Sequence, residues 1–101
     1  MQLMVLSHNP NINNNKLTLK DFAKKVKEES DELVKAIEEG DIDHIAEEAL
    51  DNIQINIAVL DKLESQGLDI KQAVNKHLKK LKSRKWRYKK MIVFQVYRWI
   101  E

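Results

Sequence analysis

The sequence predicts an all-α protein, a short helical bundle with three main helices per chain that is completed by oligomerisation. The chain of 101 residues holds only two Gly and one Pro, so it has few helix breaks. Apolar residues recur at a helical period in three segments, and a side chain suited to helix capping precedes each segment. The length fits one domain with a core small enough to gain from a partner subunit.

The first helix is expected from about Leu19 to Glu39. Thr18 can cap its first turn together with Asp21, in the pattern of a capping box, and Gly40 can end it. Its apolar stripe follows the helical period and consists of Leu19, Phe22, Ala23, Val26, Leu33 and Ile37. The two aromatic residues Phe22 and Trp86 are expected in the core.

The second helix is expected to begin at Asp41 or Asp43, to continue to about Ser65 and to end at Gly67. Its apolar residues cover close to half of the circumference: Ile45, Ala46, Ala49, Leu50, Ile53, Ile57, Leu60 and Leu63. Further apolar residues extend this surface to another side. A helix of this kind needs more neighbours than one three-helix chain supplies, which predicts an oligomer.

The third helix is expected after Asp69, which can cap it, with a packing face of Ile70, Val74, His77, Leu78 and Leu81. Residues His8 to Asn15, with Pro10 and several Asn, are typical of a turn or loop. The sequence leaves the structure of two segments undecided. Residues 1–6 suit a strand, an arm or a subunit contact, and the tail after Trp86 suits a strand, a continued helix or a contact with a partner chain.

Composition excludes several classes of site and location. The chain has no Cys, so disulfides and thiolate metal sites are absent. The first residues lack the features of a signal peptide, and no apolar run reaches the length of about 18 residues that a membrane span needs. A cytoplasmic protein is therefore expected. No Gly-rich phosphate loop, Ser/His/Asp arrangement or zinc-ligand spacing is present.

Two pairs of acidic residues mark the candidate site. Glu29 and Glu32 are three residues apart in the first helix, and Glu48 and Asp51 are three apart in the second. This spacing puts both members of a pair on one side of a helix, beside the apolar stripe. On adjacent antiparallel helices the four carboxylates would converge, and such an oxygen-rich site suits Mg²⁺ together with substrate phosphates. The pattern indicates a metal-dependent helical phosphohydrolase.

Charge is strongly segregated along the chain. Residues 28–64 carry a net charge of −11, and residues 71–90 carry ten basic residues and no acid. Lys79, Lys80 and Arg84 can contact substrate phosphates or form an ordinary basic helix surface. Asn52, near the carboxylates, can orient substrate or a metal-bound water, or can serve helix packing.

With both motifs placed, the chain resembles the MazG-like family of all-α nucleoside triphosphate pyrophosphohydrolases. The first motif, E-E-x-x-E, is Glu28, Glu29 and Glu32, and the second, E-x-x-D, is Glu48 and Asp51. The resemblance divides the chain into residues 1–16 as an N-terminal arm or loop, 17–86 as a MazG-like helical domain, and 87–101 as a C-terminal apolar tail.

The resemblance implies a helical bundle that is completed by formation of a homodimer or tetramer. It implies Mg²⁺, with Mn²⁺ as a substitute, held by Glu29, Glu32, Glu48 and Asp51. It also implies hydrolysis of a nucleoside triphosphate between the α and β phosphates, with Glu28 or Glu29 as the base that takes the proton from water. Lys79, Lys80, Arg84 and Asn52 would then bind substrate.

Two other functions compete with the enzyme. The charge segregation and the apolar tail also suit a non-enzymatic helical module for oligomerisation or interaction. Nucleic-acid binding through the third helix is less favoured, because the acidic segment would repel the same phosphates.

Overall fold

The computed structural model describes residues 2–93, and these residues confirm the all-α class with three main helices. The residues from Val5 to Leu68 form one compact unit, and residues 2–4 together with residues 69–93 belong to a second. Within residues 2–93 the structure has no β-strand, only an isolated bridge between His8 and Asn13.

Helix α1 extends over Leu19–Glu39, as the sequence predicts. Its capping box is formed in both directions: the Asp21 amide donates to Thr18 Oγ1 at 3.2 Å, and the Thr18 amide donates to Asp21 Oδ2 at 2.9 Å. At the other end Gly40 adopts the left-handed conformation with φ 83°, which glycine enters without strain. The bounds of α1 are therefore set by its two end residues.

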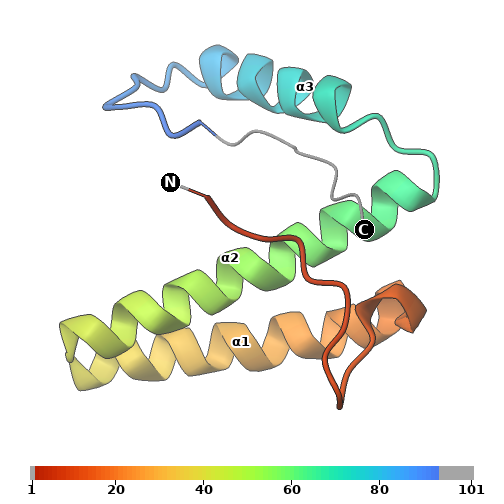
Figure 1. Ribbon diagram of the computed structural model, residues 1–101. Helices are drawn as coiled ribbons and strands as arrows, with labels where there is room; N and C mark the ends of the chain where they lie inside the picture. The colour runs from red at the N-terminus through yellow and green to blue at the C-terminus, as the bar shows by residue number, and fades with distance from the viewer. Residues whose placement is uncertain (1, 94–101) are drawn as a thin grey trace. The chain divides into compact units, whose positions relative to one another are not determined.

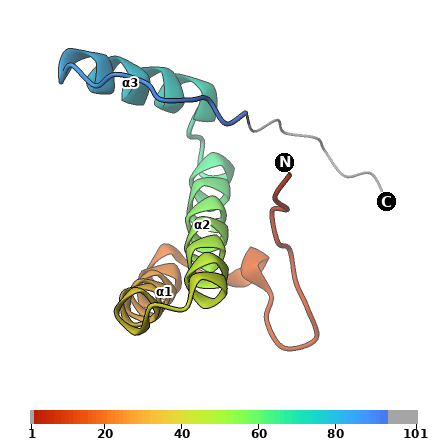
Figure 2. The same ribbon diagram turned by 90° about the vertical axis from the view of Figure 1, so that its left-hand side faces the viewer.

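Helix α2 extends over Ile42–Ser65, and only Gly40 and Asp41 connect it to α1. The Asp41 side chain caps α2 by accepting a hydrogen bond from the Asp43 amide at 3.1 Å. Because the connection is so short, α2 turns back along α1, and the two helices lie side by side and antiparallel (Figures 1 and 2). This hairpin brings the middle of α1 close to the first half of α2.

The core of the hairpin is small and lies between α1 and α2. Phe22 is 2% exposed, and Ala36 and Ala58 are also buried. The two alanines let the helix backbones approach each other closely. The prediction that Phe22 lies in the core is confirmed, and the same prediction for Trp86 is wrong, because Trp86 is 65% exposed.

Many other apolar side chains of the hairpin are exposed. The large ones on α1 and α2 are between 38 and 81% exposed and comprise Leu19, Val34, Ile37, Ile42, Leu50, Ile53 and Leu60. Two helices can cover only one side of each other, so the remaining apolar sides stay in contact with solvent. The expectation of an oligomer stays a prediction.

The segment before α1 is a hydrogen-bonded loop. Asn9 Oδ1 accepts hydrogen bonds from the amides of Asn11 and Ile12, both at 2.8 Å. A 3₁₀ turn, η1, follows at Asn14–Lys16, and Lys62 Nζ of α2 donates to the Asn15 carbonyl at 3.3 Å. The loop predicted between His8 and Asn15 is therefore present, and a cavity of about 220 Å³ lies between it and α2.

Helix α3 extends over Ile70–Ser83, and the Asp69 side chain caps it by accepting from the Gln72 amide at 3.0 Å. Lys85 has a φ of 63°, and the Trp86 amide donates to the Leu81 carbonyl, which closes the helix end. The predicted tail falls partly outside the described residues, which end at residue 93. In the part of the chain that the structure describes, no helix combines the length and the apolar character needed to cross a membrane.

Candidate functional site

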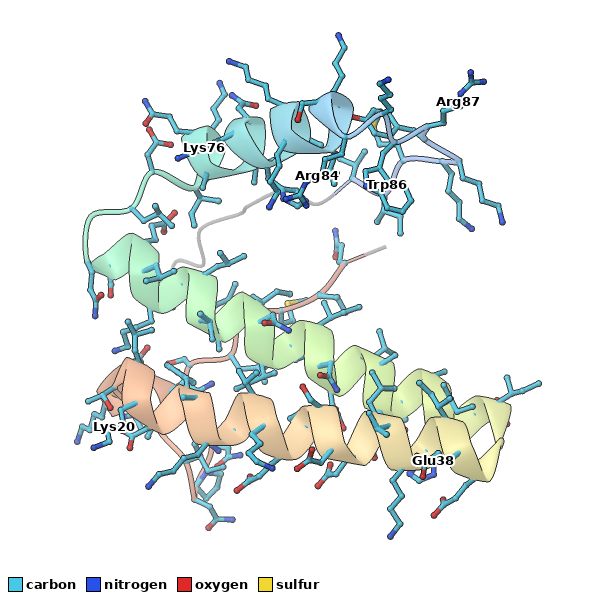
Figure 3. All side chains as sticks on the ribbon, turned by 180° about the vertical axis from the view of Figure 1, so that it is seen from behind. Lys20, Glu38, Lys76, Arg84, Trp86 and Arg87 are labelled. Atoms are coloured by element: carbon cyan, nitrogen blue, oxygen red, sulfur yellow. The ribbon has the colours of Figure 1, made fainter. Side chains whose placement is uncertain are left out.

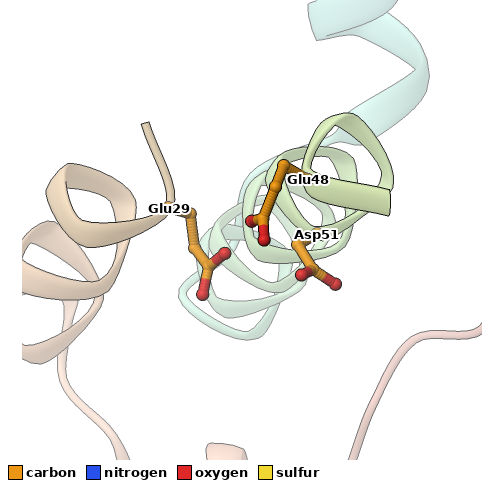
Figure 4. Close-up of side chains that lie close together, drawn as sticks. All are labelled: Glu29, Glu48 and Asp51. Atoms are coloured by element: carbon orange, nitrogen blue, oxygen red, sulfur yellow. The ribbon is translucent and has the colours of Figure 1, made fainter. Parts of the chain in front are cut away.

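The middle of the α1–α2 hairpin gathers three carboxylates. Glu29, Glu48 and Asp51 each offer one carboxylate oxygen, and these three oxygens lie within 4.8 Å of one another. Glu29 extends from α1 toward Glu48 and Asp51 of α2 (Figure 4). Two of these side chains come from one turn of α2, and the third faces them because the antiparallel hairpin brings α1 alongside.

Burial makes this cluster unusual for acidic side chains. Glu29 and Glu48 are half-buried, and Asp51 is exposed. Oε2 of Glu29 and Oε2 of Glu48 are both shielded from solvent and have no hydrogen-bond partner among the residues that the structure describes. A buried carboxylate oxygen is costly unless a hydrogen-bond donor or a cation compensates for the lost hydration. The two oxygens therefore suit a site that receives a positive charge.

The electrostatics of Glu29 agree with this geometry. Burial raises the pKa of the Glu29 carboxyl above its ordinary value of 4.5, and the charges of Glu32, Asp51, Glu48 and Glu28 raise it further. Without a cation, the folded protein therefore disfavours the ionised form of this side chain.

Glu32 lies beside the cluster. Its side chain is exposed, and it does not belong to the group of three whose oxygens lie within 4.8 Å. The charge of Glu48 is the main cause of a raised pKa of Glu32. Desolvation and a hydrogen bond between the two carboxyl groups raise this pKa further. The structure thus brings three of the four predicted ligands together and places the fourth next to Glu48.

Glu28, predicted as a candidate base, is exposed on α1. Its charge contributes to the raised pKa values of Glu29 and Glu32, so it lies within electrostatic range of the cluster. Its role in catalysis stays a prediction.

Asn52 forms hydrogen bonds between the two helices at the site. Its amide nitrogen donates to the Glu29 carbonyl at 2.7 Å and to the Glu48 carbonyl at 3.1 Å. The Ser30 hydroxyl lies 3.4 Å from Asn52 Oδ1, the acceptor side of the same amide. Contact between Asn52 and a substrate stays a prediction.

His44 is a residue of the site that the sequence analysis missed. Its Nε2 lies 3.3 Å from Glu48 Oε1, and its Nδ1 lies 3.8 Å from Glu39 Oε2. The signal was present in the sequence, because His44 precedes Glu48 by four residues and therefore lies one turn before it on the same side of α2.

The three predicted phosphate ligands lie in the second unit. Lys79 and Lys80 are exposed on α3. Arg84, labelled in Figure 3, is the C-cap of this helix. Lys80 and Lys82 also lie in the last turn of α3, where positive charge is favourable. Their contact with substrate phosphates stays a prediction.

The donor set of the cluster fits a hard divalent cation. All candidate ligand atoms are carboxylate oxygens, which Mg²⁺ prefers, and no histidine or thiolate belongs to the group of three. Oε2 of Glu29 and Oε2 of Glu48, which are shielded from solvent and lack a hydrogen-bond partner within residues 2–93, would gain a compensating charge. The residues that could hold the cation are Glu29, Glu48 and Asp51, with Glu32 adjacent.

Comparison with known proteins identifies the family. No curated protein and no solved structure matches the chain significantly. The family model of the MazG nucleotide pyrophosphohydrolase domain matches residues 17–88, a range that includes all three helices and both acidic pairs. The chain therefore belongs to the MazG nucleotide pyrophosphohydrolase domain family.

Proposed function

We propose that this protein is a Mg²⁺-dependent nucleotide pyrophosphohydrolase. It converts a nucleoside or deoxynucleoside triphosphate and water into the monophosphate and pyrophosphate, and it removes unwanted nucleotides. The observation that carries the proposal is the convergence of Glu29, Glu48 and Asp51 within 4.8 Å, with two buried oxygens that have no partner in the described part of the chain. Family membership supports the same reaction class.

The metal-binding residues in this proposal are Glu29, Glu32, Glu48 and Asp51. When bound, Mg²⁺ neutralises charge on the triphosphate and lowers the pKa of a coordinated water, and Mn²⁺ can take its place. The carboxylates also repel the substrate, so a triphosphate binds productively only together with the cation.

The protein groups around the metal complete the reaction. Glu28 or Glu29 accepts the proton as the water oxygen forms a bond to phosphorus, and the bond between that phosphorus and the α–β bridging oxygen breaks. Pyrophosphate leaves with the electron pair of that bond. Lys79, Lys80 and Arg84 hold the phosphates, Arg84 through paired hydrogen bonds and the lysines as point charges.

A homodimer or tetramer is part of the proposal, supported by the exposed apolar side chains of the hairpin. Leu50 and Ile53 of α2 are each more than 40% exposed. Burying such side chains against a second copy would contribute roughly 1.5–3 kcal/mol for each one that becomes fully covered. Sedimentation of the wild-type protein against Ile53→Lys tests this, because a lysine at a subunit contact would shift the assembly toward monomer.

Assay of a panel of NTPs and dNTPs with Mg²⁺ tests the enzyme. We expect pyrophosphate release, which Glu48→Gln lowers by roughly a hundredfold or more because the ligand charge is lost. The matched control is Glu47→Gln, since Glu47 is an exposed neighbour outside the cluster. Release of orthophosphate, or equal activity in both variants, would contradict the proposal.

A non-enzymatic interaction module is the second candidate, and the exposed apolar side chains of α1 and α2 are the observation in its favour. It predicts no heat of Mg²⁺ or Mn²⁺ binding in calorimetry and no turnover of any nucleotide. Metal binding that depends on Glu48 would exclude it as the complete function.

A further inference from the structure

We propose that Asn52 is a positioning residue, which holds α1 and α2 in the register that brings the acidic cluster together. This inference rests on the proposed metal site and assigns a role to a side chain that is not itself a candidate metal ligand. The observation behind it is that one side-chain amide binds the main chain of a candidate ligand residue on each of the two helices.

The residues joined by Asn52 are the ones whose carboxylates converge. Its amide nitrogen donates at 2.7 Å to the carbonyl of Glu29 and at 3.1 Å to the carbonyl of Glu48. Of the two ends of the Asn52 side-chain amide, only the NH₂ group can donate to a carbonyl oxygen, so these two acceptors determine which way the amide points. The NH₂ group has two hydrogens, and in this arrangement each can point at one of the two carbonyls.

A bond to main-chain atoms controls helix register more tightly than a bond between two long side chains. The Glu29 carbonyl moves only when α1 itself moves, and Asn52 has a short side chain with two rotatable bonds. A shift of α1 by one residue would displace that carbonyl by about 1.5 Å along the helix, enough to break a hydrogen bond of normal length. The Asn52 bond therefore opposes sliding of Glu29 past Glu48 and Asp51.

The surroundings strengthen this contact. Asn52 is half-buried, so water competes less for its hydrogen bonds than at the surface. The Ser30 hydroxyl can donate to Oδ1 across 3.4 Å, which gives the amide a second, weaker contact with α1. The carboxylates gathered at the site repel one another, and without a cation this repulsion tends to separate the helices. A contact that holds α1 and α2 together at this point opposes that repulsion.

Asn56 provides a matched control on the same helix. It is also an asparagine of α2, and its amide also donates to a carbonyl four residues earlier, that of Asn52, at 2.9 Å. Asn56 is exposed, and the hydrogen bond of its side-chain amide stays within α2. A substitution at Asn56 therefore removes the same chemical group and the same type of local bond without removing the cross-helix contact.

The experiment measures Mn²⁺ binding alone by calorimetry in the full-length protein, for wild type, Asn52→Leu and Asn56→Leu. Leucine has the same number of side-chain heavy atoms and the same branching as asparagine, with a good helix propensity but no donor. We expect Asn52→Leu to weaken Mn²⁺ binding by about tenfold, in the range seen when supporting contacts of metal ligands are removed. Asn56→Leu is expected to stay within about twofold of wild type.

Thermal unfolding shows whether each variant folds, and kinetics separate a positioning role of Asn52 from a loss of stability. At saturating Mn²⁺ we expect the nucleotide KM of Asn52→Leu to stay within about twofold, while the Mn²⁺ concentration for half activity rises about tenfold. If Asn52→Leu does not fold, Asn52→Ala provides the same test, because alanine is the best helix former and leaves no bulk between the helices.

Three outcomes would overturn the inference. Mn²⁺ affinity equal to wild type in the Asn52 variants would reject the positioning role and leave the proposed enzyme intact. An equal loss of Mn²⁺ affinity in the Asn52 and Asn56 variants would show that the loss comes from general helix stability and not from positioning by Asn52. Absence of Mn²⁺ binding by the wild-type protein would reject the proposed function itself, and the positioning role with it.

Discussion

His44 and Glu48 contact each other one turn apart on α2, with Nε2 of the imidazole 3.3 Å from Oε1 of the carboxylate. Glu48 is half-buried and His44 is exposed, so the imidazole lies on the solvent side of the carboxylate. The contact involves Oε1, and Oε2 of Glu48 is the oxygen without a partner among the described residues. The imidazole can therefore orient this carboxylate and leave its second oxygen available to a cation.

The first prediction follows from that contact. His44→Leu removes the donor and should raise the Mg²⁺ concentration for half-maximal activity by about tenfold, because an unsupported ligand side chain must be ordered on binding. His44→Gln keeps an N–H donor at the end of a flexible chain and should lose less. Titration of activity with Mg²⁺ compares the two variants, and equal behaviour of both with wild type would show that the contact is dispensable.

The second prediction concerns stability without metal. Glu29→Gln removes a carboxyl group whose pKa is raised by burial and by four neighbouring carboxylates. We expect it to stabilise the metal-free protein by up to about 1 kcal/mol, with solvent screening limiting the gain, and to abolish activity. Urea unfolding in the presence of a chelator measures this. Glu28→Gln is the control, because Glu28 is exposed and makes the smallest of the contributions to the raised pKa of Glu29.

The third prediction is a pH dependence of the same metal-free stability. The pKa values of Glu29 and Glu32 are raised above 4.5 in the folded state, so between 4.5 and the raised values the native state binds more protons than the unfolded state. Stability should therefore increase as pH falls from neutrality through this window. Asp21 has a pKa lowered below 3.8, chiefly by the hydrogen bond from the Thr18 amide, so its contribution is lost only at lower pH.

Thermal unfolding from pH 7 to pH 4.5 with a chelator checks the third prediction. The double variant Glu29→Gln/Glu32→Gln should lose most of the increase, since neither substituted group titrates. An unchanged increase in this variant would assign the effect to other carboxyl groups. With Mn²⁺ present the wild-type trend should reverse, because protons compete with the cation for the same oxygens.

The fourth prediction addresses the connection between α1 and α2. Gly40 has a φ of 83°, and a Cβ atom placed on it would have no heavy atom within 4 Å. Gly40→Ala should therefore destabilise the protein by backbone strain alone, by about 1 kcal/mol, and Gly40→Asn by less. Urea unfolding of the two variants measures the difference. Equal stability of Gly40→Ala and wild type would mean that the connection adopts another conformation.

The sequence by itself determined the helices and the residue types at the site. Thr18, Gly40 and Asp69 mark helix ends through local hydrogen bonds and backbone preferences, and the structure places the ends of α1 and α3 there. The i, i+3 spacing within each acidic pair is also a local property. The sequence also indicates that Asn52 and Glu29 lie at the same level of the hairpin. Glu29 is eleven residues before Gly40, and Asn52 is eleven residues after Asp41.

Only the tertiary structure decided which atoms meet between α1 and α2. Helical periodicity states which residues share a side of one helix, but it does not give the rotation and axial shift of one helix relative to another. Those depend on the close packing of Ala36, Ala58 and Phe22 and on the Asn52 hydrogen bonds. For this reason Glu29 joins Glu48 and Asp51, while Glu32, equally acidic and one turn later, lies outside the group of three.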